Sequence, residues 1–127
     1  MSSEPPHTAG ATFIPLDEVA LSRLRELDPD GRHGVLQRVL TAFDTSLSRM
    51  MVQLANERDE GHAAVVSTVA HTLKSSSASV GALPLARACA DIEKRLREGI
   101  PGDLGADVER LLREGEAALD SVRAMLR

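Results

Sequence analysis

Aromatic residues are almost missing from this sequence. Phe13 and Phe43 make up 2% of the chain, and neither Trp nor Tyr occurs. Proteins that bind single-stranded nucleic acid stack bases on aromatic side chains, and this chain has almost none to offer. The net charge is −4 and the isoelectric point lies near 5.5, so no basic surface is expected for nucleic acid or anionic lipid. Neither nucleic acid nor a membrane is therefore an expected partner.

Cysteine and long apolar runs are scarce as well. The single Cys89 excludes an internal disulfide and fits a reducing compartment. No apolar run approaches the roughly 20 residues that a membrane-spanning helix needs. The N-terminal stretch MSSEPPHTAG lacks the basic and hydrophobic segments of a signal peptide. These absences predict a cytoplasmic protein, with a monomer as its expected state.

The residues that are present follow a helical pattern. The chain has 127 residues, of which 43% are apolar, enough for the core of one domain. Apolar stripes with helical spacing, separated by turn residues, predict helices at about 16–27, 34–58, 62–80, 83–98 and 104–127. No stretch alternates with period two for long enough to predict a strand. We therefore expect an all-α fold, an antiparallel up-down four-helix bundle with a short additional N-terminal helix. The proline-containing residues 1–14 are expected to form a flexible arm before the bundle domain at 15–127.

Several single residues mark where these helices begin, end or pack. Asp17 and Asp59 are the expected N-caps of the first and third helices, and Gly81 is the expected left-handed C-cap of the third. Cys89 falls in the apolar stripe of the fourth helix and is expected to be a buried small hydrophobe. Gly115 lies inside the last helix, where its cost of about 1 kcal/mol relative to Ala has no explanation in the sequence.

The third predicted helix has two different sides. At about 100° per residue, an apolar cluster lies opposite His71: Val65, Val66, Val69, Leu73 and Val80. On the side of His71, every neighbour except Lys74 is small: Ala64, Ser67, Thr68, Ser75 and Ala78. An exposed helix face usually has long charged residues, which are good helix formers. This small-residue set, called the docking face below, leaves room for another protein to approach. Ser76 and Ser77 turn inward, toward the edges of the apolar stripe.

His71 and Lys74 together indicate phosphoryl chemistry. An imidazole is a nucleophile that is substantially neutral near pH 7, and attack on a phosphoryl group gives a labile phosphohistidine. Lys74, three residues on, lies on the same side of the helix and offers a cation for the phosphoryl oxygens. No carboxylate of this helix face lies within a turn of His71, where it would repel phosphate. No glycine-rich phosphate loop is present, so both donor and acceptor are expected to be other proteins.

The stretch AHTLKSSSASVGA, residues 70–82, resembles the signature of histidine-containing phosphotransfer (HPt) domains. These domains are four-helix-bundle intermediates of multistep phosphorelays. The resemblance continues through Leu85, Cys89, Ile92, Glu93 and residues 97–99. It implies that His71 is phosphorylated by an aspartyl phosphate on a receiver domain and that Lys74 assists.

The same resemblance implies the partners and one departure. Response-regulator receiver domains or a hybrid sensor histidine kinase would dock on this chain. No cofactor is expected on the chain itself, and Mg²⁺ is expected on the receiver partner. Many members have Gly where this chain has Ser75, at a position where the partner's backbone comes close. Serine is small, so docking is expected to survive, with partner choice open to change.

Two other function classes stay open at this point. A helical interaction module could dock a receiver or a kinase without accepting phosphate. An enzyme, such as a histidine kinase remnant or a phosphatase, would need nucleotide binding or turnover, for which the sequence shows no residues. The chain is therefore expected to be a phosphocarrier and not an enzyme. His7 is expected to be an ordinary exposed histidine, and His33 a structural or solvent-exposed one in a turn. His62 lies on the opposite side of the helix from His71, so the two are not expected to hold one metal ion.

Overall fold

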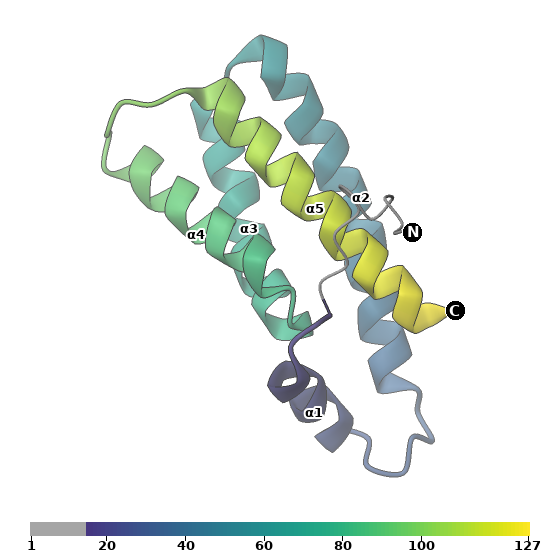
Figure 1. The fold of residues 1–127 in the computed structure, drawn as a ribbon. Helices are drawn as coiled ribbons and strands as arrows, with labels where there is room; N and C mark the ends of the chain where they lie inside the picture. The colour runs from purple at the N-terminus through teal and green to yellow at the C-terminus, as the bar shows by residue number, and fades with distance from the viewer. Residues whose placement is uncertain (1–14) are drawn as a thin grey trace, which may run out of the picture.

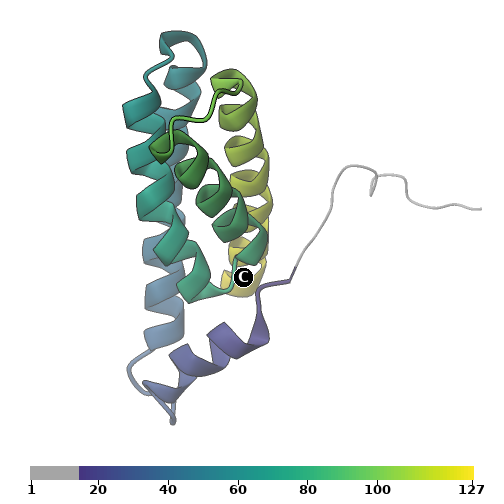
Figure 2. The ribbon, with the colours of Figure 1, turned by 90° about the vertical axis from the view of Figure 1, so that its left-hand side faces the viewer.

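The computed structural model describes residues 15–127, which form a helical bundle (Figure 1). Its helices are α1 (Glu18–Glu26), α2 (Val35–Glu60), α3 (Ala63–Val80), α4 (Leu83–Arg97) and α5 (Leu104–Leu126). Helices α2 to α5 run alternately in opposite directions, and α1 lies across one end of the bundle (Figure 2). The predicted fold class is therefore confirmed. The predicted arm at 1–14 lies outside the described residues, and within the described part no helix is long and apolar enough to cross a membrane.

Leucine and valine fill the space between the helices. The largest fully buried side chains are aliphatic and come from each of the four long helices: Leu40, Leu47, Leu54, Leu73, Leu85 and Leu111. Phe43 is the one aromatic residue in the described part, and it is 5% exposed. Aliphatic side chains of similar size suit the interlocking of helix surfaces. The scarcity of aromatic residues thus agrees with a bundle core.

The short helix α1 is fixed to the bundle by a close backbone contact. The N–H of Asp17 donates to the carbonyl oxygen of Gly81 at 2.9 Å, and the Asp17 side chain accepts from the N–H of Ala20 at 3.1 Å. Asp17 is therefore the predicted N-cap of α1. Gly81 is the predicted C-cap of α3, with a φ of 83°. A Cβ atom on Gly81 would lie 2.6 Å from the Asp17 nitrogen, so glycine is needed here both for its conformation and for its size.

The turn between α2 and α3 differs from the prediction. Helix α2 continues to Glu60, and Gly61 in the left-handed conformation closes it, so the predicted cap role of Asp59 is wrong. His62 is the N-cap residue of α3, and its side chain makes no capping bond. Instead, the buried Glu57 accepts hydrogen bonds from the backbone N–H of His62 at 2.8 Å and from its Nδ1 at 3.0 Å. A carboxylate from the preceding helix thus accepts the hydrogen bond of the backbone N–H at the start of α3.

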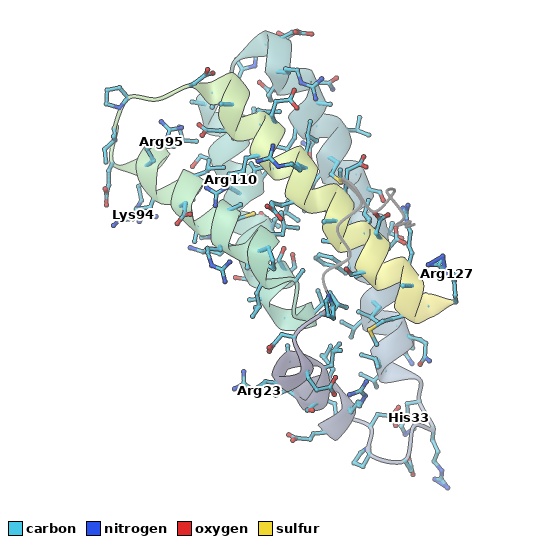
Figure 3. The ribbon with its side chains drawn as sticks, viewed as in Figure 1. Arg23, His33, Lys94, Arg95, Arg110 and Arg127 are labelled. Atoms are coloured by element: carbon cyan, nitrogen blue, oxygen red, sulfur yellow. The ribbon has the colours of Figure 1, made fainter. Side chains whose placement is uncertain are left out.

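Polar side chains hold α4 against α5. The guanidinium of Arg95 forms an ion pair with Asp107, and it also donates to the carbonyl oxygen of Ile100 at 3.0 Å. Arg110 reaches from α5 toward α4, where it lies 3.1 Å from Asp91 (Figure 3). These contacts join α4 to α5, and α4 contributes to the site described below.

Small residues line the buried sides of α3 and α4, which lie side by side (Figure 1). Ala70 and Ser77 of α3 and Ala88 and Cys89 of α4 are all 0% exposed. Burial raises the pKa of the Cys89 thiol to about 12, which excludes a thiolate at neutral pH. Cys89 is therefore the buried small residue that the sequence predicts.

Gly115 has a packing role that the sequence does not reveal. It is buried in α5, and a Cβ atom there would lie 3.0 Å from the sulfur of Met51 on α2. A glycine in mid-helix costs stability, but here it leaves room for the Met51 side chain between two long helices.

Ser77→Ala is expected to keep or raise the stability of the protein. The Ser77 Oγ is fully buried and has no hydrogen-bond partner among the described residues. An unpaired buried hydroxyl costs about 1 kcal/mol or more of stability, so its removal is expected to raise the free energy of unfolding. Alanine is also the better helix former. Urea denaturation measures the free energy of unfolding. A loss of about 1 kcal/mol in Ser77→Ala would show instead that the hydroxyl makes a bond that stabilises the fold.

Candidate functional site

His71 lies midway along α3 and points to solvent. Its side chain is 70% exposed, because the opposite side of α3 is buried in the bundle. The buried residues of this helix are Val66, Val69, Ala70, Leu73, Ser77 and Val80. Val65, which the pattern also places in the apolar stripe, is half-buried at its edge. The predicted two-sided character of this helix is confirmed.

A carboxylate from α4 lies beside His71, and the helical pattern does not predict it. Oε2 of Glu93 is 2.6 Å from Nδ1 of His71, and Oε1 of Glu93 is 2.7 Å from Nζ of Lys74. The Glu93 side chain is only 8% exposed. The expectation that this face of α3 has no carboxylate within a turn of His71 holds for the helix itself, but it does not extend to its neighbour. Glu93 is 22 residues away in the sequence and reaches the site from the neighbouring helix.

The surroundings of Glu93 keep it ionised. The hydrogen bond from Lys74, and next the one from His71, hold the pKa of Glu93 below its ordinary value. Arg97, one turn further along α4, places a guanidinium nitrogen 3.6 Å from Oε2. An ionised carboxylate can only accept hydrogen bonds, so the proton of His71 must lie on Nδ1. In the neutral ring, the lone pair then lies on Nε2.

The docking face lies around His71 as the pattern predicts. Ala64, Thr68, Ser75 and Ala78 are exposed, Ser67 is half-buried, and the Lys74 side chain is 38% exposed. Ala64 and Thr68 also line an open groove between α2 and α3. Its other lining residues are Met50, Gln53, Val65, Val69 and Thr72, none of them charged. The part contributed by α2 is not foreseen by the sequence pattern, which treats each helix separately.

The serines that follow His71 in α3 have different surroundings. Ser76 Oγ lies 3.4 Å from the carbonyl oxygens of Thr72 and Leu73, and Ser79 Oγ donates to the Ser75 carbonyl at 3.0 Å. Such bonds satisfy serine hydroxyls within a helix. Ser76 therefore bonds back about one turn along α3, whereas Ser77 is buried against the bundle.

The other histidines of the described part have no comparable surroundings. His62 pairs with Glu57 at the end of the bundle, and His33 lies exposed in the loop before α2, labelled in Figure 3. The His33 N–H donates to the side chain of Asp28 at 3.1 Å. Within residues 15–127, no three or more His, Cys, Asp or Glu side chains gather in a way that could hold a metal ion. His71 is the histidine that combines exposure with a bound carboxylate and two nearby cations.

The fold and the site together define a class of proteins, helical bundles in which an exposed histidine is held by a buried carboxylate of the neighbouring helix. The family model of the Hpt domain matches residues 35–125, and the chain belongs to this family. Its role is therefore histidine phosphotransfer in phosphorelays.

A solved structure agrees with this fold. The crystal structure of histidine-containing phosphotransfer protein B (HptB) from Pseudomonas aeruginosa PAO1 is similar, with a TM-score of 0.74. The two sequences are 23% identical, and the similarity covers 91% of this chain and 96% of that chain. At this identity the likeness shows the fold alone. Comparison with curated proteins gives no match.

Proposed function

We propose that this chain accepts a phosphoryl group on His71 from the aspartyl phosphate of one receiver domain and passes it to another. The observation behind this proposal is the exposed imidazole whose Nδ1 is held by the ionised Glu93. In the proposed step, the Nε2 lone pair forms a bond to phosphorus. The bond from phosphorus to the aspartyl oxygen breaks, and the aspartate leaves as a carboxylate. Onward transfer is the reverse reaction with a second receiver.

Two cations are available for the charge on the phosphoryl oxygens. Lys74 is bound to Glu93, yet its side chain is 38% exposed and flexible enough to turn toward a group on Nε2. Arg97, with a side chain 60% exposed, is a second candidate from α4. Phosphoryl transfer depends mainly on positioning and electrostatic stabilisation. In this proposal the chain binds no cofactor, and Mg²⁺ belongs to the receiver.

The docking face would receive the partner around His71. Its members, Ala64, Ser67, Thr68, Ser75 and Ala78, are short, so a receiver domain could bring its aspartate close to Nε2. The uncharged groove between α2 and α3 continues this surface on one side. On the other side lie Lys74 and Arg97. Partners of this kind would be response-regulator receiver domains or a hybrid sensor histidine kinase, met in the cytoplasm by a monomer of this chain.

Phosphate labelling tests the proposal. A receiver domain phosphorylated on its aspartate is mixed with the chain, and the label is followed to each protein. The chain is expected to gain phosphate that is labile in acid and stable in alkali, which is the behaviour of phosphohistidine. A stable complex with the receiver but no label at any time would show a binding module instead of a phosphocarrier.

Ser75→Gln is expected to impair transfer without unfolding the bundle. Ser75 is exposed on the docking face, one turn from His71, so a longer side chain there would stand between the two proteins. Ser75→Gly is expected to keep or improve transfer, because it removes the side chain. Rates of label transfer are compared at equal helicity, measured by circular dichroism. Unimpaired transfer by Ser75→Gln would count against close approach at this face.

A further inference from the structure

Glu93 has three positively charged or proton-donating partners from two helices. His71 and Lys74 of α3 lie 2.6 Å and 2.7 Å from its two oxygens, and Arg97 of α4 lies 3.6 Å away. The carboxylate itself is almost completely covered, with 8% of its side chain exposed. A buried carboxylate is costly unless it is paired, and here its pairs are the residues proposed to handle the phosphoryl group. Glu93 is therefore in contact with both the proposed phosphoacceptor, His71, and the proposed phosphate-binding cation, Lys74.

We propose, building on the function above, that Glu93 is a positioning residue that keeps phosphorylated His71 ready to give up its phosphoryl group. The first part of this effect concerns the proton on Nδ1. When the phosphoryl group leaves, the bond between Nε2 and phosphorus breaks and its electron pair returns to Nε2. If Glu93 holds the proton on Nδ1 throughout, the leaving group is a neutral imidazole. Without that acceptor, the phosphorylated ring loses its proton more readily, and the leaving group is the far poorer imidazolate.

The second part concerns Lys74. Its ammonium group donates to Glu93 at 2.7 Å, so a phosphoryl group on Nε2 must compete with a buried carboxylate for this cation. The negative charge of Glu93 also repels the phosphoryl oxygens directly. Both effects weaken the hold on the phosphoryl oxygens, whereas the same charge stabilises the protonated ring from which the phosphoryl group leaves. Glu93 thus makes the phosphoryl group easier to pass on and harder to retain.

Glu93→Gln tests this role because glutamine keeps the shape and removes the charge. The structure offers a matched control in Glu57→Gln. Glu57 has a side chain 9% exposed and also holds the Nδ1 of an exposed histidine, His62, at 3.0 Å. Both variants are phosphorylated with phosphoramidate, a small donor whose nitrogen–phosphorus bond breaks to release ammonia. This donor needs no receiver domain.

Two quantities are then measured on the phosphorylated proteins. One is the lifetime of phosphohistidine, and the other is the rate at which an unphosphorylated receiver domain takes up the phosphoryl group. A charge-assisted hydrogen bond corresponds to about tenfold or more in an equilibrium or a rate. Glu93→Gln is therefore expected to hold the phosphoryl group about tenfold longer and to give it to the receiver domain about tenfold more slowly. Glu57→Gln is expected to behave as the wild type, and Glu93→Asp, which keeps the charge, to lie between.

Nitrogen NMR gives a readout that a purely structural role would not change. The ring of His71 in the wild type is expected to show the proton on Nδ1, and in Glu93→Gln a mixture of both tautomers. Unchanged tautomers with a lifetime within about twofold of the wild type would overturn the proposal, as would a loss of thermal stability alone. The proposed function fails separately, if phosphoramidate labels the wild type but no receiver domain labels or unloads it. The comparison of lifetimes still decides the role of Glu93 in that case.

Discussion

His71→Gln is expected to take up no acid-labile phosphate from a phosphorylated receiver domain. The side-chain amide nitrogen of glutamine shares its lone pair with the carbonyl group and cannot attack phosphorus. The rest of the site would remain, because Glu93 keeps its partners Lys74 and Arg97. His71 is also 70% exposed, so its removal leaves no cavity in the core. Labelling is expected to fall to background while the helicity and the unfolding midpoint stay near those of the wild type.

His62→Gln is the matched control for this experiment. His62 directly precedes α3, has a side chain 61% exposed, and is also bonded through Nδ1 to a buried glutamate. It differs from His71 in having no lysine on the same carboxylate and no docking face around it. This variant is expected to be labelled at the level of the wild type. Labelling of His71→Gln at that level, or loss of labelling in His62→Gln, would mean that the phosphoryl group goes elsewhere.

Gly81→Ala is expected to destabilise the fold more than any exposed substitution. Residue 81 has a φ of 83°, a conformation that costs a side chain about 1–2 kcal/mol. A Cβ atom would also lie 2.6 Å from the Asp17 nitrogen and 2.9 Å from its carbonyl oxygen, so the backbone contact that holds α1 must open. The expected loss is about 3 kcal/mol or more in the free energy of unfolding, measured by urea denaturation.

Gly61→Ala separates the two causes of that loss. Gly61 closes α2 with a φ of 71°, and a Cβ atom there would meet nothing within 4 Å. This variant is therefore expected to lose only about 1–2 kcal/mol, from the left-handed backbone alone. Equal losses in the two variants would show that the contact between Gly81 and Asp17 adds nothing to stability.

Local sequence signals account for most of the fold. Apolar spacing places the helices within a few residues of their observed ends, because one buried stripe per helix is a property of each helix alone. Asp17 and Gly81 are also local signals, since a capping bond depends on a few neighbouring residues. Asp59 fails as a cap because the left-handed Gly61 allows α2 to continue past it. Two cap signals compete in that turn, and the sequence alone does not rank them.

A charge in a buried stripe is the signal by which Glu93 could have been found. It follows Cys89 by four residues on α4, next to the buried Ile92, and so falls on the covered side of that helix. A carboxylate is almost never fully buried without a partner. The resemblance to HPt domains includes Glu93 but assigns it no role. The helical pattern therefore predicts that Glu93 needs a partner, but not which one.

The sequence by itself determined that His71 and Lys74 share one exposed side of a helix. Residues three apart in a helix are neighbours whatever surrounds them, and the opposite apolar stripe decides which side is buried. Only the tertiary structure decided that Glu93 joins them. Its contact with His71 spans 22 residues and depends on how α4 is placed against α3 by buried small residues. Periodicity determines which face of a helix is covered, whereas the packing of the helices determines which side chain of a neighbour meets that face.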